Sequence, residues 1–377
     1  MSNTTLYFLS CDGQDCKKWG YSNPFKYYNV TDDTDMWKKL YQDIQSDNNP
    51  HKYVIHLGDQ LYMDDVNDEI LKDEITEQSQ IEQLYIDFYI KNYSKTYKQL
   101  VLKSAYNIMI CDDHEYDDNF ASVDDRINDR MKIVLNNITI LLQEKLYSYD
   151  THNIKYIKLS DCQIIMPNLR KYRQKNTSTY KYPILGETQF NELSELVTNT
   201  KEEEILSFYV STIPLVSLNY LLLKIGRLID EGVFHDDYIV SESYYNEQKL
   251  TFELISQLRK LIIVAGDYHY GEHTIISNDH KVIHQFITSP ISSDIAIKEG
   301  DNAVLNYIKD KMNKYLYQRS ITDFCIEKQK RIFDYNYLRV RSNDISLQCF
   351  QNENNYNVNI FSTLLFPKRF SLFSICC

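Results

Sequence analysis

The sequence predicts an α/β fold organised around parallel strands that are buried on both faces. Short, nearly continuous apolar runs of the kind found in such strands occur at residues 6–10, 53–57, 107–111 and 261–265. Segments with the apolar spacing of helices lie between several of these runs. Nearer the C-terminus, apolar and polar residues alternate with period two, which is typical of antiparallel strands. Together these observations favour a mixed α/β architecture.

The first half of the chain alternates predicted strands with predicted helices. In order, we expect a strand at 6–10, a helix at 35–44, a strand at 53–57, a helix at about 81–103, a strand at 107–111 and a helix at about 122–146. Ser122 is the expected N-cap of the last helix. The very acidic segment 64–80 is expected to be a solvated face or a loop, because runs of like charge are usually exposed.

The second half is predicted to begin with a hairpin. In order, we expect strands at 154–159 and 162–166, a helix at about 185–197, a strand at 206–210, a helix at 250–260, strands at 261–265, 274–277 and 282–288, a helix at 303–317, and strands at 337–341, 346–351 and 356–361. We expect the strand-rich end to extend a second sheet of the same domain.

The chain has 377 residues, a length that one large α/β domain can occupy. We therefore predict a single domain over 1–365, with its core motifs in 6–293 and a strand-rich part at 330–365, followed by a tail at 366–377. Cys376 and Cys377 lie beside apolar and basic residues in this tail and could carry two lipid chains. A frayed tail is the favoured interpretation.

The net charge of −12 argues against non-specific binding of nucleic acid, which requires a basic surface. No segment approaches the roughly 18 uninterrupted apolar residues of a membrane helix, and the N-terminus lacks a basic segment followed by an apolar one. We therefore predict a cytoplasmic protein. The eight cysteines have no zinc-type spacing and are predicted to be mostly free thiols.

Metal-competent side chains follow each of the four apolar runs. They are Cys11 and Asp12, then Asp59 and Tyr62, then Asp112, Asp113, His114 and Glu115, and finally Asp267 and His269. A single Asp after a strand is more often a helix cap or a turn residue. Four such ends together are hard to assign to capping, and ligands collect beyond the carboxyl ends of parallel strands. Carboxylates and imidazole suit a pair of metal ions, and the anionic donors Cys11 and Tyr62 favour a trivalent or strongly Lewis-acidic one.

A series of short motifs runs in order from about residue 6 to residue 293. They are Ser10-Cys11, Gly58-Asp59-Gln60-Leu61-Tyr62, Asp112-Asp113-His114-Glu115 with Asp117-Asp118-Asn119, Leu169-Arg170 with Arg173, Leu185-Gly186-Glu187-Thr188-Gln189, and Gly266-Asp267-Tyr268-His269-Tyr270-Gly271. This series resembles that of the PhoD-like alkaline phosphatases, a branch of the calcineurin-like metallophosphatases. The second and third motifs together are fairly specific, whereas Gly-Asp-x-His alone is weak.

The resemblance implies an αββα sandwich of two sheets, with helices on the outer faces and metal ions at one sheet edge. It implies that Cys11, Asp59 and Tyr62 hold one ion and that Asp59 bridges to a second. Asp113 takes the place of the Asn or Asp ligand of the second ion. The implied ligand set is completed by Asp267 and His269.

The resemblance also implies catalytic side chains. His114 is similar to the histidine that stabilises or protonates the leaving group. Arg170 and Arg173 resemble the family's basic loop, and either one is a candidate for contacting phosphate. Asp112 is expected to support its neighbours or to cap the turn.

We therefore predict a binuclear metal-dependent phosphoester hydrolase, a phosphodiesterase or phosphomonoesterase that uses metal-bound hydroxide. The expected cofactors are Fe³⁺ and a divalent ion, Ca²⁺, Mn²⁺ or Zn²⁺. The expected partner is a small-molecule or lipid phosphoester. Two alternatives are a mononuclear non-haem iron enzyme, which leaves Cys11 unexplained, and a catalytically silent metal-binding protein.

Overall fold

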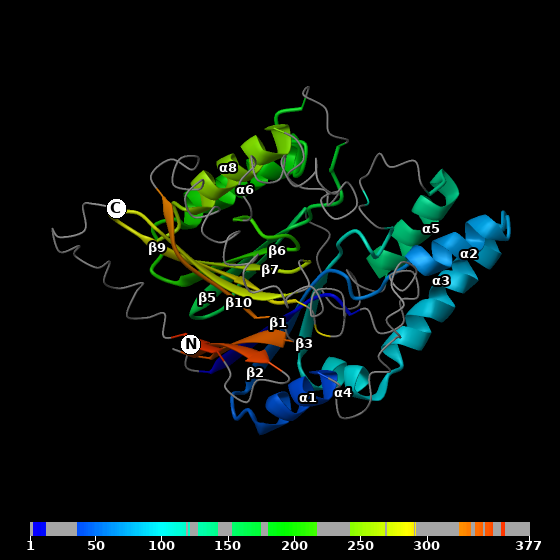
Figure 1. Cartoon of the computed structure of the whole chain (residues 1–377), viewed down its shortest axis with the longest axis horizontal. Coiled ribbons are helices and arrows are strands. Elements are labelled where there is room, and N and C mark those ends of the chain that lie inside the picture. Colours follow the sequence, from blue (N-terminus) through cyan, green and yellow to red (C-terminus); the bar gives the residue numbers. More distant parts are fainter. Residues whose placement is uncertain are drawn as a thin grey trace, which may run out of the picture.

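Two β-sheets pack face to face, and helices cover both outer faces (Figure 1). The computed structural model describes residues 3–12, 36–117, 120, 127–141, 153–174, 180–216, 242–267, 270–289, 291, 324–332, 336–341, 344–349 and 356–358. The predicted αββα sandwich is therefore confirmed for this part of the chain. Each sheet mixes parallel and antiparallel strands.

The first sheet, called sheet A, has the strand order β13-β12-β11-β1-β2-β3. Its parallel half is formed by β1 (Thr4–Leu9), β2 (His51–Leu57) and β3 (Tyr106–Ile110). Its antiparallel half is formed by β11 (Asn336–Arg341), β12 (Asp344–Cys349) and β13 (Tyr356–Val358). Strands β11 to β13 thus extend the sheet that contains β1. We had expected them to extend a second sheet.

The second sheet, called sheet B, has the order β10-β8-β9-β7-β6-β5-β4. Its strands are β4 (Ile154–Lys158), β5 (Cys162–Pro167), β6 (Leu206–Ser211), β7 (Lys260–Ala265), β8 (Gly271–Ser277), β9 (Val282–Ile287) and β10 (Cys325–Ile332). β5, β6, β7 and β9 run parallel to one another, and the predicted hairpin of β4 and β5 is confirmed.

Period-two alternation distributes the side chains of β1 between two hydrophobic cores. Leu6 and Phe8 enter the core between the sheets, where the ring of Phe8 lies 5.6 Å from that of Phe208. Tyr7 and Leu9 point to the opposite face and pack against the helices there. Both faces of β1 are therefore buried, which accounts for the unbroken apolar run in its sequence.

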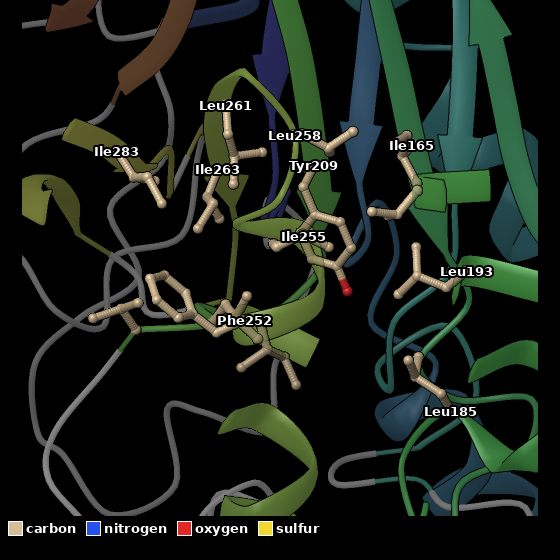
Figure 2. Packing of buried hydrophobic residues seen from close by; sticks show 14 of the residues in the cluster. Ile165, Leu185, Leu193, Tyr209, Phe252, Ile255, Leu258, Leu261, Ile263 and Ile283 are labelled. Carbon is tan, nitrogen blue, oxygen red and sulfur yellow. The ribbon is translucent and has the colours of Figure 1, made fainter. Parts of the chain in front are cut away.

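Helices α1 (Met36–Ser46) and α4 (Thr96–Ser104) cover sheet A, and α6 (Gly186–Thr200) and α8 (Glu242–Ile255) cover sheet B (Figure 1). Figure 2 shows Tyr209 and Ile263 of sheet B gathered with Phe252 and Ile255 of α8 in one cluster. Burying a side chain of this size contributes roughly 1.5–3 kcal/mol. The expected helix at 250–260 begins earlier and ends at Ile255, and Lys260 already belongs to β7.

A third group of helices lies to one side of the sandwich (Figure 1). It comprises α2 (Asp64–Lys72), α3 (Gln78–Tyr93) and α5 (Asp129–Thr139), which share their own hydrophobic cluster. The expectation of a solvated face or loop at 64–80 is confirmed for most of this segment, although part of it forms the helix α2. Its outer side is exposed, but its inner side carries buried residues.

Two helix boundaries also differ from expectation. The expected helix at 81–103 is broken after Tyr93 and resumes at Thr96. Helix α5 is capped by Asn128, whose side chain accepts a hydrogen bond from the Met131 N–H. Ser122, the expected cap, and the expected helix at 303–317 lie outside the described residues.

No helix among the described residues is both long enough and apolar enough to cross a membrane. Cys11, Cys111, Cys162 and Cys349 are buried free thiols.

Candidate metal centre

Acidic side chains from both sheets converge where the parallel strands end. Asp59 follows β2, Asp112 and Asp113 follow β3, and Asp267 follows β7. Each of these four side chains offers a carboxylate oxygen, and the four oxygens lie within 4.8 Å of one another. We call this set the acidic cluster. Its members come from three separate parts of the sequence, so the sandwich itself assembles them.

The turns that present these side chains have an unusual backbone. Cys11, Asp59 and Asp267 have φ angles of 59°, 54° and 68°, in the left-handed region that residues other than glycine rarely adopt. Among the described residues only one other non-glycine residue, Glu74, has a positive φ. Such conformations are costly and concentrate at functional sites. The strain therefore coincides with three of the predicted ligands.

Gly58 is required directly before Asp59 for two reasons. Its φ is +89°, and a Cβ at this position would lie 2.4 Å from the Cβ of Asp112. The missing side chain therefore allows the ends of β2 and β3 to approach each other. This close approach brings Asp59 beside Asp112 and Asp113.

The carboxylate of Glu115 holds the same two turns together. It accepts hydrogen bonds from the backbone N–H groups of Asp59, Gln60 and Asp112, at 3.1, 2.6 and 2.6 Å. Glu115 is buried and its side chain faces the backbone of the turns. It is thus a fixed part of the scaffold, and the final residue of the Asp-Asp-His-Glu motif has a structural explanation.

Cys11 lies against the acidic cluster. Its Sγ is 3.4 Å from Oδ2 of Asp59 and 2.9 Å from Oγ of Ser289. Burial, and then the negative charge of Asp267, raise the pKa of the Cys11 thiol to about 12. In the absence of a cation this thiol is protonated at neutral pH, whereas a bound metal ion would favour the thiolate.

His114 is oriented by Asp64, a residue that the sequence analysis did not single out. The Nδ1 atom of His114 lies 2.8 Å from Oδ2 of Asp64, and both side chains are buried. The His114 ring packs against Tyr62, with 4.1 Å between ring centroids and an angle of 31° between the ring planes. A ring nitrogen of His114 is also within 4.8 Å of oxygens of Asp59 and Asp113. The sequence carries no signal that pairs Asp64 with His114, because this contact depends on how α2 packs in the folded chain.

Arg170 reaches the acidic cluster from the loop after β5. Its Nε atom lies 2.5 Å from Oδ1 of Asp112, and an NH2 nitrogen lies 3.1 Å from Oδ1 of Asp113. Thr212, at the end of β6, donates a further hydrogen bond to Asp112 at 2.7 Å. Arg173 is buried too, and its guanidinium lies over the ring of Tyr244 at 5.3 Å. Arg170 therefore contacts the acidic cluster directly.

Three of the predicted strand-end residues remain, namely Asp12, His269 and Tyr62. Asp12 is committed to an ion pair with the buried Lys98, with Oδ2 and Nζ 2.7 Å apart, and so it supports the scaffold. His269 lies outside the described residues, as does Tyr268. Tyr62 is buried on the loop after Asp59.

The electrostatics of the acidic cluster suit a cation. Burial raises the pKa of Asp59 well above its usual value, and the charges of Cys11, Asp113, Asp112 and Asp267 raise it further. Within the described part of the chain, Oδ1 of Asp59 and Oδ2 of Asp112 are buried and have no hydrogen-bond partner. Buried carboxylates of this kind are paired or coordinate metal ions. The residues present therefore fit metal binding.

Comparison with solved structures supports the fold assignment. The structure of PhoD matches with a TM-score of 0.55 and 13% sequence identity, over 94% of this chain and 68% of that chain. Purple acid phosphatase PPD1 from yellow lupin (Lupinus luteus) seeds matches with a TM-score of 0.50 and 10% identity, over 97% of this chain and 56% of that chain. No protein-family model and no curated protein matches the chain. At these identities the likeness shows the fold, and it confirms the resemblance to the metallophosphatases at that level.

Proposed function

We propose that this chain is a binuclear metal-dependent phosphoester hydrolase. The observation that carries the proposal is the acidic cluster, in which carboxylates from both sheets meet beside a buried arginine. The fold shared with PhoD and a purple acid phosphatase is consistent with this activity. The proposed substrate is a phosphomonoester or phosphodiester of a small molecule or lipid.

The proposed ligands of the first ion are Cys11, Asp59 and Tyr62, with Asp59 shared between the two ions. Asp113 and Asp267 supply oxygens, and His269 is the remaining proposed ligand. When bound, two metal ions in such a site lower the pKa of a bound water to about 7 and polarise the phosphoryl oxygen. The anionic donors Cys11 and Tyr62 favour Fe³⁺ as one ion, with Ca²⁺, Mn²⁺ or Zn²⁺ as the other.

The protein's own side chains account for the rest of the proposed mechanism. Asp64 binds Nδ1 of His114 and leaves Nε2 to donate a proton to the oxygen of the leaving group. Arg170 places a fixed positive charge beside the cluster, where it can neutralise the equatorial phosphoryl oxygens. Burial of these groups excludes water and strengthens both interactions.

The test combines elemental analysis with a panel of phosphoesters. We expect two metal ions per chain in the reconstituted protein and hydrolysis of at least one monoester or diester. Asp59→Asn is expected to lose at least one ion and nearly all hydrolysis, while its circular dichroism spectrum stays that of the wild type. Asp129→Asn is the matched control, because the Asp129 side chain is 98% exposed.

The outcomes separate this proposal from the alternatives. A single ion with oxygen-dependent turnover would favour the mononuclear iron enzyme. Two ions without turnover of any ester would favour the silent metal-binding protein. If Asp59→Asn retained both ions and normal turnover, the assignment of the site would be wrong.

A further inference from the structure

The segment Leu185-Gly186-Glu187-Thr188-Gln189 has no role in the mechanism above, although it is part of the motif series. It forms the start of α6, behind the loop that carries Arg170. Its last residue, Gln189, is fully buried at 0% exposure. Burying an amide side chain is costly unless it is hydrogen-bonded. The partners of Gln189 therefore indicate its purpose.

Gln189 binds both backbone groups of a single residue in the arginine loop. Its Oε1 accepts a hydrogen bond from the N–H of Asn168 at 2.8 Å, and its Nε2 donates one to the carbonyl oxygen of Asn168 at 2.8 Å. Nε2 also donates to the carbonyl oxygen of Leu185 at 3.2 Å. This pairing fixes the Asn168 peptide groups relative to α6.

Asn168 transmits this constraint to Arg170. Its Oδ1 accepts hydrogen bonds from the N–H groups of Arg170 and Lys171, each at 3.0 Å, in a local turn. The Arg170 guanidinium then binds Asp112 and Asp113, and also donates to the carbonyl oxygen of Phe120 at 3.2 Å. A continuous set of hydrogen bonds thus joins Gln189 to the acidic cluster.

Two further contacts hold the segment against the loop. A Cβ on Gly186, whose φ is +71°, would lie 2.9 Å from the Cβ of Tyr172, so the missing side chain permits close approach of the loop. The carboxylate of Glu247 on α8 accepts hydrogen bonds from the N–H groups of Ile184 and Leu185, at 2.5 and 2.8 Å. The start of α6 is therefore anchored to α8 on one side and to the loop that carries Arg170 on the other.

We propose that Gln189 is a positioning residue that sets the guanidinium of Arg170, through Asn168, at the acidic cluster. The geometric part of this inference stands on the contacts above. Its consequence, that phosphate binds less tightly when Gln189 is changed, rests on the proposed function. Displacements of about 1 Å in a positioned group can reduce rates by up to about 100-fold.

The first experiment reads the position of Arg170 directly. The Nε–H resonance of Arg170 is observed by NMR in the full-length protein labelled with ¹⁵N-arginine, and it is identified by its loss in Arg170→Lys. Gln189→Met keeps the size of the side chain but removes both hydrogen bonds to Asn168 and the one to Leu185. This variant is expected to shift or broaden the signal. Gln163→Met is the matched control, because Gln163 is equally buried but binds Ser207 and Tyr156 on sheet B.

The second experiment measures inorganic phosphate binding to the metal-loaded protein by calorimetry. Gln189→Met is expected to weaken binding by roughly 10- to 100-fold with unchanged metal content, and to add no further loss in an Arg170→Ala background. Asn168→Asp retains the acceptor for the Arg170 N–H and is expected to bind phosphate like the wild type. Asn168→Ala is expected to behave like Gln189→Met.

The outcomes are distinct. An unmoved Arg170 resonance in both Gln189→Met and Asn168→Ala would overturn the proposal, as would an equal effect of Gln163→Met. If Gln189→Met does not fold, the two Asn168 variants decide the question, because they leave α6 unaltered. If the metal-loaded wild type binds no phosphate, the proposed function fails, and the resonance alone decides whether Gln189 positions Arg170.

Discussion

Asp64 and His114 form a buried pair, with 2.8 Å between the carboxylate and Nδ1 of the imidazole. The two residues come from different parts of the chain, since Asp64 opens α2 and His114 follows β3. The pair fixes the orientation of the imidazole. This relationship gives α2 a role in the candidate site, although it lies in the helical group beside the sandwich.

We expect His114→Ala to retain both metal ions but to lose rate, because leaving-group assistance of this kind contributes roughly 100- to 10,000-fold. Asp64→Asn should cause a smaller loss in the same direction and no further loss in the His114→Ala background. Both losses should be smaller for activated aryl esters, whose leaving groups need less protonation. The measurement is kcat against leaving-group pKa, and an equal loss across good and poor leaving groups would exclude the acid role.

The scaffold behind the cluster depends on Lys98 of α4. Its Nζ atom pairs with Asp12 at 2.7 Å and donates to the carbonyl oxygen of Gln60 at 3.2 Å. It also lies over the ring of Tyr93 at 4.2 Å. Lys98 therefore joins the turn after β1 to the turn after β2, directly behind Cys11 and Asp59.

Removing one partner of such a buried pair leaves an uncompensated charge, so Lys98→Met is expected to cost roughly 3–5 kcal/mol of unfolding free energy. The double variant Lys98→Met with Asp12→Asn should recover part of this loss, because it removes the stranded charge. Urea denaturation followed by circular dichroism measures both. If the single and double variants were equally stable, the cost of Lys98→Met would not come from the unpaired charge of Asp12.

The sequence predicted those site residues that terminate strands. An apolar run that stops at Gly58-Asp59 or Gly266-Asp267 marks both the end of the strand and a member of the acidic cluster, because the two share one short segment. Asp64 was not predicted, since its contact with His114 depends on how α2 packs. In the same way, the pairing of Asp12 with Lys98 is invisible in sequence, because the two are joined only in the folded chain.

Sheet membership shows the same limit. The strand at Asn336–Arg341 was predicted from its alternation, but its partner was not. It pairs antiparallel with β1, with Val340 opposite Leu6. Local alternation specifies a strand and its buried face, whereas the choice of partner depends on contacts between residues hundreds of positions apart.

Glu247 predicts a pH dependence of stability. Burial raises the pKa of this carboxyl from 4.5 to about 7, despite the hydrogen bonds it accepts from the N–H groups of Ile184 and Leu185. The folded protein therefore binds a proton here more tightly than the unfolded chain. The resulting stabilisation is fully present below about pH 4.5 and is lost as the pH rises through 7.

Glu247→Gln should abolish this contribution, because Gln does not titrate. Relative to the variant, the wild type is expected to lose stability as the pH rises from 4.5 to 8. The loss is up to about 3 kcal/mol of unfolding free energy. Denaturant titrations at several pH values measure it. A difference that stays constant over this range would show that Glu247 titrates normally.

The last prediction concerns the identity of the ion held by Tyr62. An unperturbed tyrosine hydroxyl has a pKa of about 10, so only a strongly Lewis-acidic ion holds a tyrosine as a phenolate at neutral pH. Tyr62 is buried three residues after Asp59 and packs against His114, beside the acidic cluster. If Tyr62 and Cys11 bind Fe³⁺, the air-oxidised protein should be coloured, since ferric phenolate and thiolate centres absorb visible light. Tyr62→Phe should shift or remove the band without loss of the fold, and Tyr85→Phe, which alters an equally buried phenol that donates to Asn67, is the control. A colourless, fully active enzyme without iron by elemental analysis would defeat the ferric assignment and leave the two-metal proposal standing.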